Sequence, residues 1–426
     1  MNLPPSEGPD PPAPLPAGFD EAGEWLLGLE LFGMDFGTAR MKRLLRALGD
    51  PQAGLRAVHV VGSNGKSSTT RLVAAILGAH GLRAGAYLSP HLVSWTERVL
   101  VDGRPVAEDA FARAATGVAG AVALVDAEGA FGPVTQFEAL TAIAFVALAQ
   151  ERVDVAVIEA GLGGRLDATN VLEAPVTACT SVGLEHTQWL GETLPEIASE
   201  KLDVVAPGSV LVVPADLAPE AMDVAIAVAG ERGARLVVAP ASSPLAPDGT
   251  PPYLSHNLAL ALAAANEVLG RIDEAAVHAA VDAGALRIPG RFEPAGERPV
   301  TILDGAHNPD GIAALAAALG GFPGPLVACL AVLDDKDTDA MLRALAGTVD
   351  RLVTTTCSHP RSVPASSLAG SAERLGLEAE AVDGPHDALA RARELAGEGG
   401  TVAATGSLYL IADLGRPPGD EGGSTL

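Results

Sequence analysis

The chain has 426 residues, of which 48% are hydrophobic and only 4% aromatic, and it carries a formal net charge of −25. This length predicts two or three domains with large cores built from Ala, Val and Leu. The charge argues against nucleic acids and anionic membranes as partners, and no run of about 18 apolar residues indicates a membrane span.

The first 19 residues are rich in proline and acidic residues, and we expect a disordered tail there. They contain no apolar segment of the kind that a signal peptide needs. Residues 25–48 carry helical periodicity and are expected to pack beside the next segment. Cys179, Cys329 and Cys357 lie far apart without a C-x-x-C pair, which fits a reduced, cytoplasmic compartment.

Residues 58–68 combine an apolar strand, a glycine-rich turn and the start of a helix expected over residues 67–80. Backbone N–H groups in such a turn cradle phosphate oxygens, Lys66 would reach the terminal phosphates, and Ser67 could ligate Mg²⁺. The turn is shorter than the full P-loop consensus, which has glycine where Val60 stands. The lysine and serine after the last glycine favour ATP binding over a turn that only packs. The expected phosphate-binding residues are Gly62, Ser63, Asn64, Gly65, Lys66, Ser67 and Ser68.

Three polar residues follow apolar strands of the same predicted sheet. Ser89 follows a strand over residues 84–88, Glu159 follows one over residues 153–158, and His186 follows the next apolar strand. Because the carboxyl ends of parallel strands meet at one edge, these side chains are expected to converge beside the phosphate loop. Hydroxyl, carboxylate and imidazole suit Mg²⁺ when phosphate and water fill the remaining positions. Taken singly, each also has an ordinary role as a cap, an ion-pair partner or a core histidine.

Strands and helices alternate through this part of the chain. Residues 96–105 are typical of a hairpin or loop, and the capping box at residues 135–138 predicts a helix that ends near residue 150. The further elements expected are a strand over residues 176–182, a helix over 194–204, strands over 210–213 and 236–238, and a helix over 256–269. This alternation predicts a mostly parallel sheet with helices on both faces.

Proline, glycine and charged residues interrupt the pattern at residues 287–299, which we interpret as an interdomain linker. Strands are expected again over residues 300–303, 326–330 and 401–409. The predicted fold is therefore α/β, with a doubly wound P-loop domain over residues 20–288 and a smaller C-terminal α/β domain over residues 289–426.

Lysine is rare in this chain, which has 24 arginines but only Lys42, Lys66, Lys201 and Lys336. Arginine keeps its proton, whereas lysine can be neutral, nucleophilic or covalently modified. Since phosphate binding accounts for Lys66, Lys201 and Lys336 become candidates for further chemistry. Chance survival in an arginine-rich composition is the alternative for each.

These motifs together resemble the folylpolyglutamate synthase/dihydrofolate synthase family of the muramyl-ligase superfamily. The resemblance runs from about residue 25 to residue 413. It rests on the sequences at residues 62–66, 89–92, 97–98, 159–170, 186–191, 200–201, 289–291, 304–309 and 405–409. It implies that Ser89, Glu159 and His186 bind Mg²⁺ and that Lys201 is carbamylated. It also implies that ATP contacts Asn257, Arg291, Asp304 and His307.

The implied activity is ATP-dependent amide formation, in which an acceptor carboxylate is phosphorylated and the amine of L-glutamate then displaces phosphate. The implied acceptor is dihydropteroate, a reduced folyl-glutamate, or both. Lys66, Lys201 and His307 are the expected catalytic residues, and we expect a cytoplasmic monomer. Two residues depart from the family pattern, Ser67 in place of glycine and Glu185 in place of aspartate.

Two other functions stay open on the sequence. A muramyl-type ligase shares these motifs but needs a separate domain for its UDP-sugar, for which residues 1–57 are too short and too rich in proline. A non-catalytic ATP-binding regulator needs Lys66 but has no use for His307 or the metal-binding residues.

Overall fold

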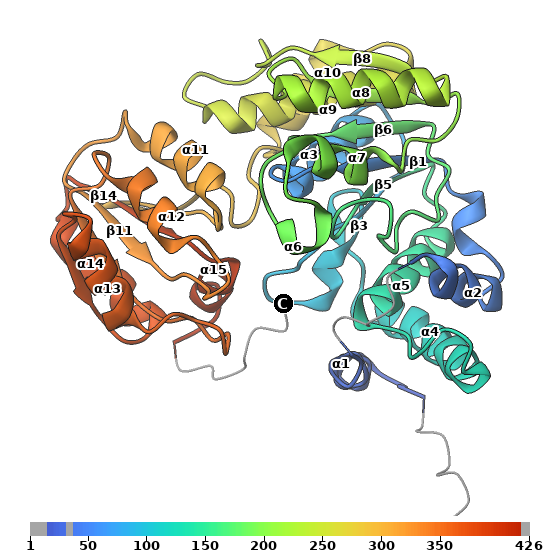
Figure 1. The fold of residues 1–426 in the computed structure, drawn as a ribbon, viewed down its shortest axis with the longest axis horizontal. Coiled ribbons are helices and arrows are strands. Elements are labelled where there is room, and N and C mark those ends of the chain that lie inside the picture. The colour runs from blue at the N-terminus through green and yellow to red at the C-terminus, as the bar shows by residue number, and fades with distance from the viewer. Residues whose placement is uncertain (1–14, 31–36, 419–426) are drawn as a thin grey trace, which may run out of the picture.

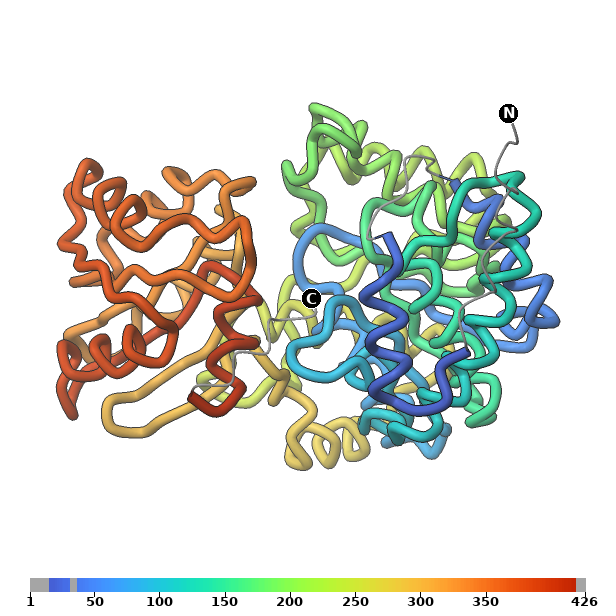
Figure 2. Tube along the Cα trace, turned by 90° about the horizontal axis from the view of Figure 1, so that it is seen from below, coloured from blue at the N-terminus to red at the C-terminus, as the bar shows by residue number. Residues whose placement is uncertain are grey.

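The computed structural model describes residues 15–30 and 37–418, which form two α/β bodies that lie side by side (Figure 2). Most of the tail predicted over residues 1–19 lies outside the described residues. Within the segment expected to be helical, the described residues form two helices, α1 (Phe19–Leu27) and α2 (Ala39–Ala47).

The first body is built on an eight-stranded sheet with the strand order β4-β3-β2-β5-β1-β6-β7-β8. Its strands are β1 (Ala57–Val61), β2 (Ala84–Tyr87), β3 (Val99–Val101), β4 (Arg104–Pro105), β5 (Val155–Glu159), β6 (Val176–Cys179), β7 (Val210–Pro214) and β8 (Arg235–Ala239). The strands from β2 to β8 in this order pair in parallel, whereas β3 and β4 are antiparallel additions at one edge. The predicted mostly parallel sheet is confirmed.

Helices cover both faces of this sheet (Figure 1). One face carries α3 (Lys66–Ala79), α9 (Pro252–Leu269) and α10 (Glu274–Asp282). The other carries α4 (Glu108–Glu128), α5 (Gln136–Gln150), α7 (Leu194–Leu202) and α8 (Pro219–Arg232), with α1 and α2 outside them. The short elements are η1 (Pro51–Gly54), η2 (Trp95–Arg98) and α6 (Thr187–Leu190). Alternate residues of β5 contribute to the two opposite cores, so this strand is apolar on both faces.

Helix α4 is the one helix among the described residues that is long and apolar enough to cross a bilayer. However, 56% of its most apolar window is buried inside the protein, and it packs against α1, α2 and α5. Its apolar side chains therefore belong to the core of the first body.

The second body contains a six-stranded sheet with the order β13-β12-β11-β14-β10-β9. Its strands are β9 (Glu293–Glu297), β10 (Val300–Leu303), β11 (Leu326–Leu330), β12 (Arg351–Thr354), β13 (Ala379–Ala381) and β14 (Thr401–Thr405). Its helices are α11 (Pro309–Leu319), α12 (Thr338–Leu345), α13 (Ala365–Arg374), α14 (Pro385–Ala396) and α15 (Leu408–Leu414). All pairs are parallel except β9 with β10. The segment interpreted as a linker, residues 287–299, thus includes an edge strand of the second sheet.

Strand β6, helix α9 and the strand expected over residues 401–409 differ most from their predicted ends. Strand β6 stops at Cys179, three residues early, because Thr180 and Ser181 turn to bind the phosphate loop. Helix α9 starts at Pro252, before the predicted residue 256, with proline at its first position. The strand expected over residues 401–409 ends at Thr405, and the Ser407 side chain then caps α15.

Candidate active site

The predicted phosphate loop connects β1 to α3, and two of its glycines are sterically required. Gly62 has φ +145°, and a Cβ atom there would lie 1.9 Å from Thr180 Oγ1. Gly65 has φ +85°, and a Cβ atom there would lie 2.5 Å from Asn257 Oδ1. Any side chain at either position would therefore clash with a neighbour and strain the backbone.

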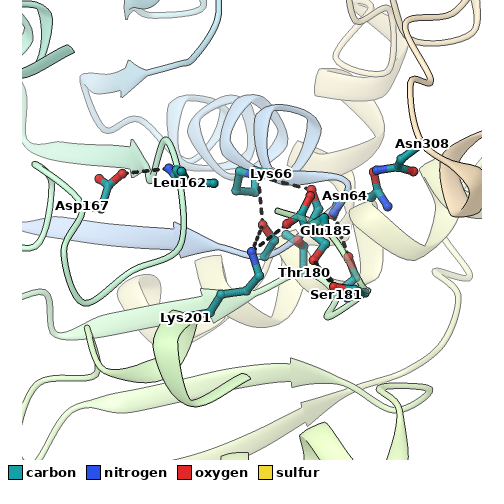
Figure 3. A network of polar contacts seen from close by, with 12 residues as sticks. Asn64, Lys66, Leu162, Asp167, Thr180, Ser181, Glu185, Lys201 and Asn308 are labelled. Carbon is teal, nitrogen blue, oxygen red and sulfur yellow. Dashed lines mark hydrogen bonds and ion pairs between the residues drawn. The ribbon is translucent and has the colours of Figure 1, made fainter. Parts of the chain in front are cut away.

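The turn is held by hydrogen bonds from the end of the neighbouring strand. Ser181 Oγ accepts the Asn64 N–H at 2.9 Å, and Thr180 Oγ1 donates to the Asn64 carbonyl at 2.6 Å. Asn64 also meets the second body, since Asn308 Nδ2 donates to its Oδ1 at 2.9 Å (Figure 3). The phosphate loop therefore lies where the two bodies touch.

The two lysines expected to act in catalysis share one acceptor. The Gly62 carbonyl accepts from Lys66 Nζ at 2.9 Å and from Lys201 Nζ at 3.1 Å (Figure 3). Lys66 Nζ also donates to the Ser63 carbonyl at 3.2 Å. Lys66 therefore folds back over its own loop, with its charge close to the phosphate-binding turn.

Lys201 is almost fully buried, at 1% exposure, and forms an ion pair with Glu185 at 2.8 Å. Burial alone would raise the pKa of Glu185, but the Lys66 and Lys201 ammonium groups outweigh it and lower that pKa to about 2. Burial lowers the pKa of Lys201. The side chain thus has its own carboxylate partner, and its carbamylation stays a prediction.

Glu159 lies at the end of β5, is buried, and is held from two directions. Ser67 Oγ donates to its Oε1 at 2.8 Å, and the Ser89 N–H donates to its Oε2 at 3.1 Å. Burial raises the pKa of Glu159, and the charge of Lys66 opposes this shift. Of the predicted metal-binding residues, Ser89 and Glu159 are therefore brought together.

His186 lies at the start of α6 with the left-handed φ of +46°. Burial lowers its pKa, which favours the neutral imidazole that a metal ion requires. No hydrogen bond joins it to Glu159 within the described ranges. The described residues also contain no group of three or more His, Cys, Asp or Glu side chains arranged for a metal ion. The predicted magnesium site therefore depends on hydroxyl, phosphate and water oxygens as well.

The residues of the second body that are predicted to contact ATP form a second wall, which faces the wall of the first body that contains the phosphate loop. Asp304 accepts hydrogen bonds from Tyr253 Oη at 2.7 Å and from the Phe292 N–H at 2.8 Å, so it ties the two bodies together. Arg291 donates to the Gly290 carbonyl, and His307 Nδ1 lies 2.8 Å from the Gly305 carbonyl. Burial lowers the pKa of His307 to about 4, so its ring is neutral near pH 7.

Both walls enclose a single cavity of about 990 Å³. Its lining includes almost every predicted site residue: Ser63, Asn64, Gly65, Lys66, Ser67, Ser68, Ser89, Glu159, His186, Lys201, Asn257, Arg291, Asp304 and His307. Gly62 does not line the cavity, and its carbonyl accepts the hydrogen bonds of Lys66 and Lys201. The cavity continues past the phosphate loop to apolar side chains that include Phe137, Leu140 and Leu162. It can therefore hold a polyanion and an aromatic acid at the same time.

Comparison with known proteins decides the family. The family description "Mur ligase, glutamate ligase domain" matches residues 290–408. The dihydrofolate synthase/folylpolyglutamate synthase of Mycobacterium tuberculosis is 35% identical over 80% of this chain and 79% of its own length. The Bacillus subtilis protein of the same name is 30% identical over 93% and 98%. This chain belongs to the folylpolyglutamate synthase/dihydrofolate synthase family.

Solved structures of the family agree in fold. The M. tuberculosis folylpolyglutamate synthase complexed with ADP superposes with a TM-score of 0.86 at 31% identity, over 94% of this chain and 99% of that one. E. coli FolC in complex with DHPP and ADP gives 0.82 at 30% identity, over 94% and 97%. The chain spans only half the length of the Haloferax volcanii protein, named as a probable bifunctional folylpolyglutamate synthase/dihydropteroate synthase.

The structure also pairs polar side chains to which the sequence analysis assigned no role. Arg98 Nε donates to His91 Nδ1 at 2.8 Å, and both side chains are buried beside the cavity. Tyr253, which binds Asp304, lies outside every motif used above. Its partner is 51 residues away, so no local pattern could have indicated it.

Proposed function

We propose that this member of the family joins L-glutamate to dihydropteroate, to a reduced folyl-polyglutamate, or to both, with conversion of ATP to ADP and phosphate. The observation that carries the proposal is the single cavity in which both bodies meet over the phosphate loop. We further propose that the chain divides at residues 288 and 289 and acts as a cytoplasmic monomer.

ATP is assigned to the phosphate loop and to the facing residues of the second body. Relatives support this assignment, since the M. tuberculosis and E. coli structures hold ADP. Asn257 lies against Gly65, while Arg291 and His307 face the loop across the cavity. We assign Lys66 to the transferring phosphoryl group, where an ammonium ion stabilises the developing charge.

A divalent ion fits beside Glu159. The donors there are a buried carboxylate with a serine hydroxyl already on one oxygen, and hard oxygen donors of this kind suit Mg²⁺. We assign the ion to Ser89, Glu159 and His186, where it would neutralise phosphate charge. A solved bifunctional folylpolyglutamate synthase/dihydrofolate synthase, 30% identical to this chain, holds Mn, AMPPNP and L-glutamate.

The acceptor acid is assigned to the apolar end of the cavity. The Phe137 ring closes this end against Gly161, where a Cβ atom would come within 2.3 Å of the ring. An aromatic acid seated there would direct its carboxylate towards Lys66. On the second body, Lys336 and Arg361 flank Asp335 at 3.1 and 3.3 Å, and we assign these cations to the carboxylates of glutamate.

The order of the reaction steps follows because an ionised carboxylate has no leaving group. Glutamate's amine cannot displace oxide from an ionised acid, so the acceptor oxygen first attacks the γ-phosphorus of ATP and ADP leaves. The amine then attacks the acyl carbon, loses a proton and expels inorganic phosphate. Closure of the second body over the first would exclude water from the acyl phosphate.

The test places ¹⁸O in the carboxylate of dihydropteroate and of a reduced folate, with ATP, Mg²⁺ and L-glutamate. One labelled oxygen is expected in inorganic phosphate, together with ADP and the glutamyl product. AMP and pyrophosphate, or unlabelled phosphate, would contradict the acyl-phosphate route. Turnover only with UDP-muramyl substrates would indicate a muramyl ligase, and no ligation with any acid would indicate a regulator.

A further inference from the structure

A buried histidine in β1 has no role in the site described above. His59 is fully buried in the central strand of the first sheet, between Ile158 of β5 and Thr177 of β6. It does not line the cavity, so it cannot touch a substrate. A fully buried imidazole is costly unless it is hydrogen-bonded, and this one has a specific partner.

That partner belongs to the glycine-rich loop over residues 161–170. His59 Nε2 lies 2.8 Å from Thr169 Oγ1, across 110 residues of sequence. The Thr169 hydroxyl donates its own proton to Asp167 Oδ1 at 2.5 Å. A hydroxyl has only one proton, so the Thr169 oxygen must accept from His59, which fixes the proton on Nε2.

The other ring nitrogen is consistent with this tautomer. His59 Nδ1 has no hydrogen-bond partner among the described residues, so no acceptor there requires a proton on it. Burial lowers the pKa of His59 to about 4, so the ring is neutral at physiological pH. The imidazole therefore supplies one hydrogen-bond donor, the Nε2–H group, and its acceptor is Thr169 of the loop.

Asp167 is the end point of this chain of hydrogen bonds, and unlike His59 it faces the cavity. Its Oδ2 accepts the Leu162 N–H at 2.8 Å (Figure 3), and its Oδ1 accepts the Thr169 N–H at 2.9 Å. The carboxylate thereby closes the loop on itself. Leu162, Asp167 and Ala168 then form part of the wall assigned above to the acceptor acid.

We propose that His59 and Thr169 are positioning residues that fix the acid-binding loop, through Asp167, to the strand that carries the phosphate loop. Strand β1 leads directly into Gly62 of the phosphate loop, and the acid-binding loop follows the end of β5 at Glu159. Both substrates would therefore be positioned relative to the same rigid part of the sheet. Misplacement of bound groups by about 1 Å can cost about 100-fold in rate. These hydrogen bonds, which we call the His59–Thr169–Asp167 relay, would therefore determine the affinity for the acid more than the affinity for ATP. This proposal rests on the proposed function for the identity of the acid.

The test compares Thr169→Val, which removes the hydroxyl, with Thr169→Ser, which keeps it. Calorimetry measures the Kd of dihydropteroate and of a reduced folyl-monoglutamate in the presence of a non-hydrolysable ATP analogue, and the Kd of the analogue itself. We expect Thr169→Val to weaken acid binding about tenfold, to change nucleotide binding less than about twofold, and to speed hydrogen exchange at the Leu162 amide. Thr169→Ser should resemble the wild type in all three.

A second variant separates positioning from stability. Thr169→Val leaves the buried His59 donor unsatisfied, which lowers the melting temperature as well. In the double variant His59→Leu/Thr169→Val that orphaned donor is gone, so stability should recover in part while acid binding stays weak. Recovery of acid binding together with stability, equal weakening of acid and nucleotide, or unchanged exchange at Leu162 would each overturn the proposal.

Failure of the proposed function looks different. If the wild-type protein binds neither acid, the assigned substrate is wrong, and exchange at Leu162 then decides alone whether the relay orders the loop.

Discussion

The two walls of the cavity hold their polar side chains in different ways. On the first body, side chains from separate elements bind one another, as Ser67 of α3 binds Glu159 of β5 and Lys201 of α7 binds Glu185. On the second body, the side-chain hydrogen bonds found within the described residues for Arg291 and His307 go to backbone carbonyls one or two positions away. These groups of the first wall are therefore fixed by contacts between separate elements, whereas Arg291 and His307 are held locally.

This difference indicates how the work is divided. A wall fixed by several elements can hold phosphate and metal in a set geometry before the reaction begins. Groups held locally on the second body act only when that body comes close to the first. Within the described residues, one side-chain hydrogen bond, from Asn308 to Asn64, joins the second body directly to the phosphate loop. The predictions below test this division from the largest expected effect to the smallest.

The largest effect is expected at Lys66, the one cation on the first wall that the phosphate loop itself contributes. Lys66→Ala should lower turnover by at least about 1,000-fold, because the transferring phosphoryl group loses its nearest positive charge. Phosphate release in the presence of dihydropteroate and glutamate measures this. A loss smaller than tenfold would show that another group stabilises the charge.

Lys201 tests whether the first wall needs a modified side chain. We expect ¹³CO₂ to give a carbamate carbon signal that disappears in Lys201→Ala, with turnover lowered about 100-fold or more and partly restored by short carboxylic acids. Because Lys201→Ala also leaves Glu185 buried without its partner, Lys201→Ala/Glu185→Gln serves as the folding control. A wild-type protein without the carbamate signal would mean that Lys201 acts only as the ion-pair partner of Glu185.

The predicted metal-binding residues should differ among themselves. Glu159→Ala and His186→Ala should raise the Mg²⁺ concentration needed for half-maximal activity by about tenfold or more. Ser89→Ala should raise it less, because the structure uses the Ser89 backbone N–H, and not its hydroxyl, to hold Glu159. Titration of activity with Mg²⁺ gives the comparison, and an unchanged Mg²⁺ requirement in both Glu159→Ala and His186→Ala would show that the ion lies elsewhere.

The second wall should affect turnover more than affinity. Arg291→Ala and His307→Ala are expected to lower kcat about 10- to 100-fold while changing the Kd of ATP less than about threefold, because they act mainly once the bodies have closed. Rapid-quench turnover and equilibrium binding separate the two quantities. Weak ATP binding with normal turnover at saturation would make them ordinary binding residues.

The last prediction concerns the stability of the protein in acid and not its activity. Burial lowers the pKa of His59 to about 4 in the folded protein, against about 6.5 unfolded, so between these values the unfolded chain binds the additional proton. The stabilisation is fully present above pH 6.5 and is lost as the pH falls towards 4, by up to about 3 kcal/mol. Urea unfolding across this range should show a shallower dependence in His59→Gln, and an unchanged dependence would contradict the shift.

The sequence predicted most of what depends on neighbours along the chain. The capping box at Thr135 and Glu138 starts α5 as expected. Ser89 and His186 follow strands of one mostly parallel sheet, and Glu159 ends another strand of that sheet. The edge strand β9 was not predicted, because its exposed Glu-Pro-Ala-Gly-Glu sequence lacks the alternation of a buried strand and pairs only with β10.

Contacts between distant side chains were beyond local patterns. Asn308 meets Asn64 across 244 residues, and His59 meets Thr169 across 110. No periodicity records such pairs, since each depends on how whole elements pack. The ion pair of Lys201 with Glu185 is a related case, because scarcity of lysine indicated the residue but not the partner.

The shared carbonyl of Gly62 has a practical consequence for chemical footprinting. Only four lysines exist in the chain, and Lys42 is exposed on α2 whereas Lys66 and Lys201 are both held at this carbonyl. An amine-directed acylating reagent should therefore modify Lys42 rapidly and Lys201 very slowly, with Lys66 between them. A bound nucleotide would draw Lys66 away from the carbonyl and cover it. The extent of acylation of Lys66, measured by mass spectrometry of its tryptic peptide, would therefore report occupancy of the phosphate loop. The separate peptide that contains Lys42 serves as the internal standard.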